Sequence, residues 1–87
     1  MDPNISALRR LVLAGWLGVP IGDPHEPDML VYTRVTPVVE DSIRVKAHDD
    51  AIAFRRVAGA ITATAEGTVV DVVTTVLGWS SSRIITW

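Results

Sequence analysis

Hydrophobic residues near the N-terminus recur every three or four positions, which is typical of an amphipathic helix. Asp2 followed by Pro3 is a favourable start, because the carboxylate accepts from free N–H groups of the first turn and proline has none to satisfy. The pattern predicts a helix over residues 3–17. Its main apolar stripe contains Ile5, Leu8, Leu11, Val12 and Trp16. Leu13 and Leu17 lie away from this stripe and form a second apolar patch, which faces either a groove of the same chain or another subunit.

Two segments in the middle of the chain have the pattern of strands. Residues 29–35 (MLVYTRV) are rich in β-branched and aromatic side chains, and residues 42–48 (SIRVKAH) alternate strictly between apolar and polar. A further short strand is indicated at residues 19–21. The polar side of the alternating segment, which we expect to point outward, consists of Arg44, Lys46 and His48.

The C-terminal half of the chain allows two interpretations that lead to different folds. In the first, residues 50–65 form a helix and residues 68–77 a strand. In the second, residues 51–57 and 61–66 are strands and a helix follows, with a stripe of Val69, Val72, Val73, Val76 and Leu77. Alanine is the best helix former and is frequent in the earlier part, whereas valine and threonine dominate the later part and lose side-chain freedom in a helix. Propensity therefore favours the first interpretation, and the second is kept as the alternative.

The predicted fold is α+β. It has an N-terminal helix, antiparallel strands, a second helix and a C-terminal β-hairpin, in which a turn at residues 79–82 leads into a last strand at 83–87 (RIITW). The alternative order is α-β-β-β-α. With 87 residues, of which 48% are hydrophobic and 21% charged, the chain is expected to form a single domain over 1–87.

Charge and composition narrow the possible partners. Ten acidic and eight basic residues give a net charge of −2, so we expect no nucleic-acid partner. The apolar run at residues 11–21 is too short to span a bilayer, and we expect no membrane partner. Cysteine is absent, so neither disulfides nor thiolate metal sites support this small core. Oligomerisation is the remaining source of stability.

Few polar side chains are arranged as chemistry requires. Residues 48–50 and 80–82 contain His, Asp and Ser but lack the rest of a catalytic site, so we predict no catalytic residues, no cofactor and no enzymatic activity. One loop carries potential metal ligands, but its two prolines limit their convergence, and we interpret it as a solvated loop without a metal. Those ligands are Asp23, His25, Glu26 and Asp28.

The chain has more large apolar side chains than a core of this size needs. A strand at the C-terminal end also has an open edge, which a neighbouring chain can pair with. We therefore predict a homo-oligomer. The predicted subunit contacts are Leu13, Trp16, Leu17, Trp79, Ile84, Ile85 and Trp87.

The order of these segments, with MLVYTRV, SIRVKAHDD and then the alanine-rich AIAFRRVAGAITATA, resembles the tail terminator (tail completion) proteins of long-tailed phages. The resemblance implies a structural protein of the virion, assembled in the host cytoplasm. It also implies a ring, typically of six copies, that caps the tail tube and contacts other tail or connector proteins. The family has no catalytic residues. The alternative is a small cytoplasmic interaction module, such as a dimeric regulatory protein, that uses the same apolar faces. In the second interpretation of residues 51–77, the order of elements also resembles the double-stranded RNA-binding domain.

Overall fold

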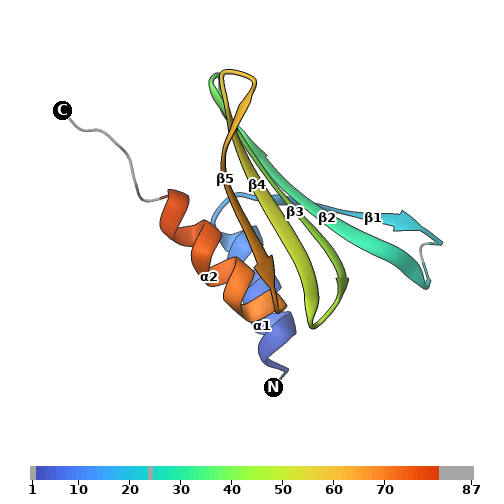
Figure 1. Ribbon diagram of the computed structural model, residues 1–87. Helices are drawn as coiled ribbons and strands as arrows, with labels where there is room; N and C mark the ends of the chain where they lie inside the picture. The colour runs from blue at the N-terminus through green and yellow to red at the C-terminus, as the bar shows by residue number, and fades with distance from the viewer. Residues whose placement is uncertain (1, 24, 81–87) are drawn as a thin grey trace.

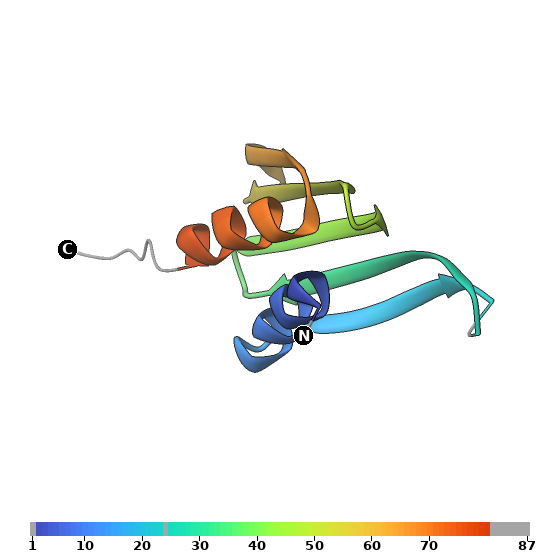
Figure 2. The same cartoon turned by 90° about the horizontal axis from the view of Figure 1, so that it is seen from below.

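The computed structural model describes residues 2–23 and 25–80, which form two helices and a five-stranded antiparallel sheet (Figure 1). Successive strands are neighbours, so the sheet is a simple meander in the order β1-β2-β3-β4-β5. Both helices lie on one face of this sheet, and no other part of the described chain covers the opposite face, which is called the open face below (Figure 2). In chain order the elements are α1 (Pro3–Leu13), β1 (Leu17–Gly22), β2 (Pro27–Val35), β3 (Val39–Ala47), β4 (Asp50–Val57), β5 (Ala60–Gly67) and α2 (Val69–Ser80).

Helix α1 begins as the sequence predicts and ends earlier. The Asp2 carboxylate accepts a hydrogen bond of 2.8 Å from the backbone N–H of Asn4, and Pro3 opens the first turn. The predicted end at residue 17 is wrong, because Gly15 takes a φ of 96° that a helix cannot contain and turns the chain into β1. The predicted stripe is also partly wrong. Ala7 and Leu11 are buried in this helix, whereas Ile5 and Val12 are exposed.

The strands predicted before residue 48 are confirmed, with longer bounds in β1 and β2 and a start three residues earlier in β3. Strand β1 approaches β2 closely at one point. A Cβ placed on Gly18 would lie 2.5 Å from a ring carbon of Tyr32, so only glycine leaves room there for the aromatic ring that lies on the helix side of the sheet. A side chain at this position would displace Tyr32 from the core.

The predicted helix at residues 50–65 is wrong, and so is the strand at 68–77. Residues 50–67 form the β4–β5 hairpin, whose two-residue turn consists of Ala58 and Gly59 with φ values of 50° and 87°. Such a turn matches the twist of the paired strands. Its sequence is unusual, because Ala58 is a non-glycine residue at positive φ and Ala-Gly is not one of the pairs, such as Asn-Gly, that indicate a hairpin. The alternative interpretation, two strands followed by a helix, is correct for these residues. Its overall order α-β-β-β-α is not, because the sheet between the two helices has five strands.

Tertiary packing explains why propensity misled here. Residues 51, 53, 63 and 65 are alanines on the helix side of β4 and β5, and their small side chains let a helix approach the sheet closely. The branched side chains of α2 fill this space. The buried residues of α2 are Val69, Val72, Val73 and Val76. The helix is held at its start by Thr68, whose hydroxyl accepts a hydrogen bond of 3.1 Å from the Asp71 N–H.

The α+β class is confirmed, and the observed order is one helix, five strands and one helix. The turn predicted at residues 79–82 is wrong at its first two positions, because Trp79 and Ser80 belong to α2. The last strand of the predicted C-terminal hairpin, residues 83–87, lies outside the described residues.

Replacing Ile43 with alanine should lower the free energy of unfolding by about 2–5 kcal/mol, because the side chain is fully buried between the sheet and the helices. Urea unfolding followed by circular dichroism measures this. The matched control is Ile61→Ala on β5, where the side chain is exposed and the change should stay within about 1 kcal/mol. Equal losses for the two variants would contradict the described core.

Candidate interaction surface

A charged row crosses the covered face of the sheet at one end of the core. Arg34, Asp41 and Arg55 lie directly opposite one another on β2, β3 and β4. The Asp41 carboxylate is fully buried and accepts two hydrogen bonds from Arg55, of 2.8 Å from Nε and 2.9 Å from Nη2. Arg34 Nη2 lies 3.6 Å from the same carboxylate. The hydrogen bond to Asp41 raises the pKa of Arg55 above its ordinary value, so this guanidinium stays charged.

Two tryptophans cover the ends of this row. The Arg34 guanidinium lies 5.5 Å from the ring centre of Trp16, and that of Arg55 lies 5.9 Å from the ring centre of Trp79. Aromatic faces attract guanidinium groups at such distances, so each tryptophan both shields and stabilises an arginine. The row is therefore part of the interior of the domain. Its charges are satisfied mainly by one another.

The open face of the sheet has a different composition. The register places Val19, Val31, Arg44, Ile52 and Glu66 opposite one another across all five strands. The next row on the same face consists of Leu17, Thr33, Ser42, Phe54 and Thr64. A sheet face that only meets water is expected to be polar, with apolar residues confined to the other side. This face instead carries apolar side chains on four of its five strands, namely Leu17, Val19, Ile21, Met29, Val31, Val35, Ile52, Phe54 and Ile61.

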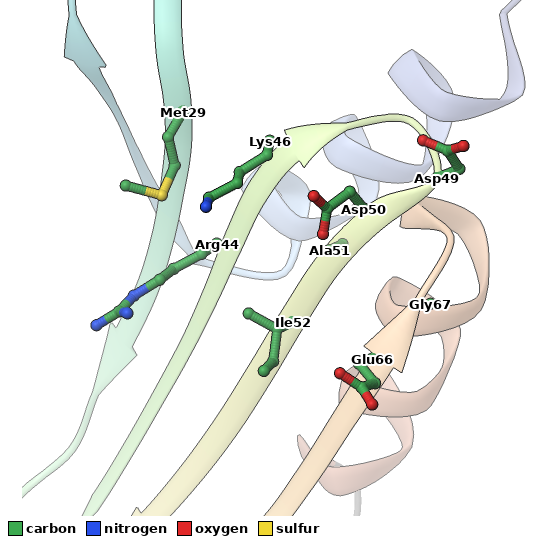
Figure 3. A pocket seen from close by; sticks show the side chains of 9 residues that line it. All are labelled: Met29, Arg44, Lys46, Asp49, Asp50, Ala51, Ile52, Glu66 and Gly67. Atoms are coloured by element: carbon green, nitrogen blue, oxygen red, sulfur yellow. The ribbon is translucent and has the colours of Figure 1, made fainter.

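An open depression of about 650 Å³ lies at one end of this face, over strands β2 to β5 (Figure 3). Met29 and Ile52 are its apolar lining, Arg44 and Lys46 of β3 are its basic side chains, and Asp49, Asp50 and Glu66 are its acidic ones. All five charged side chains are exposed. Within residues 2–23 and 25–80, the ion pairs are those of Asp41 and the Arg56–Glu40 pair, so these five make none. The Arg44 guanidinium lies 5.9 Å from the centre of the Phe54 ring.

The structure separates the residues predicted as subunit contacts. Leu13, at the end of α1, is 80% exposed, and Leu17, on the open face of β1, is 66% exposed, so the two belong to different layers. Trp16 is only 3% exposed and has almost no surface to offer a neighbour. Trp79 is half-buried beside Arg55. The three remaining predicted contacts, Ile84, Ile85 and Trp87, lie outside the described residues.

Sequence reasoning identified the outward direction of Arg44 and Lys46 and missed the apolar side chains around them. The favoured interpretation of residues 50–65 puts Ile52 and Phe54 in a helix, where they are not neighbours of β3. The Ala58-Gly59 turn lacks the Asn-Gly or Asp-Gly sequence that indicates a hairpin, although the strand alternative does put Ile52 and Phe54 on one face. The register in which β4 pairs with β3 is known only from the tertiary structure.

The polar residues considered for chemistry lie in turns. The backbone N–H of His25 donates a hydrogen bond of 2.8 Å to the Asp23 carboxylate, and His48 and Asp49 form the turn between β3 and β4. Among the described residues, no three His, Asp or Glu side chains are grouped so that they could hold a metal ion. Neither α1 nor α2, with 11 and 12 residues, is long enough to cross a membrane, and the part of the chain that the structure describes has no other helix.

Comparison of the chain with protein-family models, with curated proteins and with solved structures gives no significant match.

Replacing Asp41 with asparagine should destabilise the domain by about 3–5 kcal/mol, because the two half-buried arginines then lose their buried counter-charge. Chemical denaturation at neutral pH measures the change. Glu40→Gln is the matched control on the neighbouring position, since Glu40 pairs with Arg56 at the surface and its removal should matter by about 0–1 kcal/mol. A loss for Asp41→Asn no larger than for the control would show that the buried row does not stabilise the fold.

Proposed function

We propose that the protein is a non-enzymatic assembly subunit that acts by self-association, with the open face of its sheet as the contact surface. The observation that carries this proposal is the apolar character of that face. Side chains such as Leu17, Val19 and Ile21 on β1 are exposed, although α1 and α2 pack on the opposite side and leave this one uncovered. Exposed contiguous apolar surface on a small domain is a common mark of a protein–protein contact.

The architecture explains why the face stays open. A five-stranded meander needs cover on both sides if both are apolar, and the two helices of the described residues lie side by side on the same face (Figures 1 and 2). A second sheet stacked on the open side would bury it in the manner of a β-sandwich. The open face is therefore suited to another protein surface.

A second candidate function is a ring-forming subunit of the tail-terminator kind, which the sequence resembles. The observation that favours it is further exposed apolar surface on α1, the layer opposite to the open face, where Ile5 and Val12 are exposed on one side of the helix and Leu13 is exposed at its end. A ring requires two different patches that meet head to tail, and this chain has two. In that case the protein would belong to a virion and contact other tail or connector proteins.

The double-stranded RNA-binding interpretation has less support. The start of α2, where that family carries a lysine cluster, reads Thr68-Val69-Val70-Asp71 and has no positive charge.

Replacing Val19 with glutamate should weaken assembly and shift the protein toward the monomer, since a charge brought into an apolar contact loses its hydration. Val19 is 44% exposed on an edge strand, so the substitution should leave the fold intact. Native mass spectrometry and sedimentation over a range of protein concentrations measure the result. Val38→Glu is the control, because Val38 is 62% exposed but belongs to the β2–β3 turn. A wild-type protein that is monomeric at every concentration would overturn the proposal.

Replacing Leu13 with glutamate separates the two candidates. In a ring, the exposed apolar surface of α1 is one side of each contact, so this variant should break the ring into monomers or open chains, because a new charge cannot be buried there. In a dimer formed through the open face alone, the same variant should keep the wild-type mass. Analytical ultracentrifugation measures both outcomes. The ring is favoured if the wild-type assembly has the mass of six chains and the Leu13→Glu variant does not assemble.

A further inference from the structure

The depression on the open face is divided by charge. Arg44 and Lys46 stand on β3, and Asp50 and Glu66 stand on β4 and β5 (Figure 3). Arg44 and Glu66 belong to one cross-strand row with Ile52 between them, and Lys46 lies in the bulge beside Asp50. Two positive side chains and three negative ones, since Asp49 in the turn before β4 also lines the depression, thus form neighbouring halves of one patch that also contains Met29 and Ile52.

This division fits a second copy of the same chain better than an unrelated partner. A two-fold contact requires a surface that is complementary to itself, because each copy presents the same patch to the other. A two-fold axis parallel to the strands, between β3 and β4, would place β3 of one copy over β4 of the other, and β2 over β5. Lys46 would then lie over Asp50, and Arg44 would lie over Ile52, one strand away from Glu66. Every pairing would then occur twice. The four side chains are available, since none of them makes an ion pair within residues 2–23 and 25–80.

We infer that the protein forms a two-fold symmetric, face-to-face dimer, in which Arg44 and Lys46 of each copy pair with Asp50 and Glu66 of the other. The inference rests on the proposed function and specifies its partner and symmetry. The apolar side chains of β2, β4 and β5 on this face supply most of the buried area. The charges set the register, since like charges placed opposite one another in a contact are strongly unfavourable.

The test is a charge exchange between two variants. In one, Arg44→Glu and Lys46→Glu reverse the basic half, and in the other, Asp50→Lys and Glu66→Lys reverse the acidic half. Each variant alone should dimerise roughly a hundredfold more weakly than the wild type, because like charges then face each other twice. Their equimolar mixture should form a heterodimer with an affinity close to that of the wild type, since both pairings are restored between chains. In each variant the side chains at positions 44, 46, 50 and 66 all carry the same sign. Recovery of the wild-type affinity therefore requires contact between two different chains.

The control variant carries Arg9→Glu and Arg10→Glu on the exposed side of α1, which changes the net charge as much as the first variant does. It should dimerise as the wild type does and should not pair selectively with the variant that carries Asp50→Lys and Glu66→Lys. Thermal unfolding checks that each variant is folded. If a double variant does not fold, the single changes Lys46→Glu and Asp50→Lys provide the same exchange. Salt of about 1 M, where the screening length is about 3 Å, should remove the preference for the heterodimer.

The outcomes of this test and of the Val19→Glu test are distinguishable. A monomeric wild type overturns the proposed function and this inference together. Assembly that is lost in Val19→Glu but unchanged in both charge variants overturns this inference alone, and so does an equimolar mixture without heterodimers. A heterodimer that forms only between the two complementary variants supports the two-fold pairing.

Discussion

The contact between the valines of α2 and the alanines of β4 and β5 is the one on which the rest of the structure depends. The small alanine side chains leave space on the helix side of the sheet, and the branched side chains of Val69, Val72, Val73 and Val76 fill it. This contact holds α2, and α1 packs beside α2 on the same face (Figure 2). Since both helices are used on this side, the other face of the sheet has no cover from the described chain.

The charged row of Arg34, Asp41 and Arg55 closes one end of the same core. A buried carboxylate between two arginines is favourable only when its lone pairs are satisfied, and Asp41 meets this condition through the bidentate contact with Arg55. Trp16 and Trp79 extend the row on both sides by packing against the guanidinium groups. Two of the residues that looked like surplus apolar surface therefore have a place inside the domain, where their aromatic faces meet cations.

The open face combines apolar rows with one divided patch of charge. Apolar area provides non-directional attraction, whereas charges at fixed positions discriminate between orientations. On this sheet both are carried by rigid strands whose register is fixed by the hairpin turns and by the packing below. A surface of this kind has the properties that self-recognition requires.

The sequence by itself determined the elements whose signals are local. The Asp2-Pro3 cap, the strand at residues 29–35 and the alternation around Arg44 and Lys46 are read correctly, because capping geometry and period-two burial depend on near neighbours along the chain. Tertiary structure decided residues 50–77, where alanine became strand and valine became helix. Their side chains fit each other across the layers, and that packing outweighs the smaller intrinsic preferences of either residue. The same packing decided the interaction surface, since only the paired register brings Ile52 and Glu66 alongside Arg44.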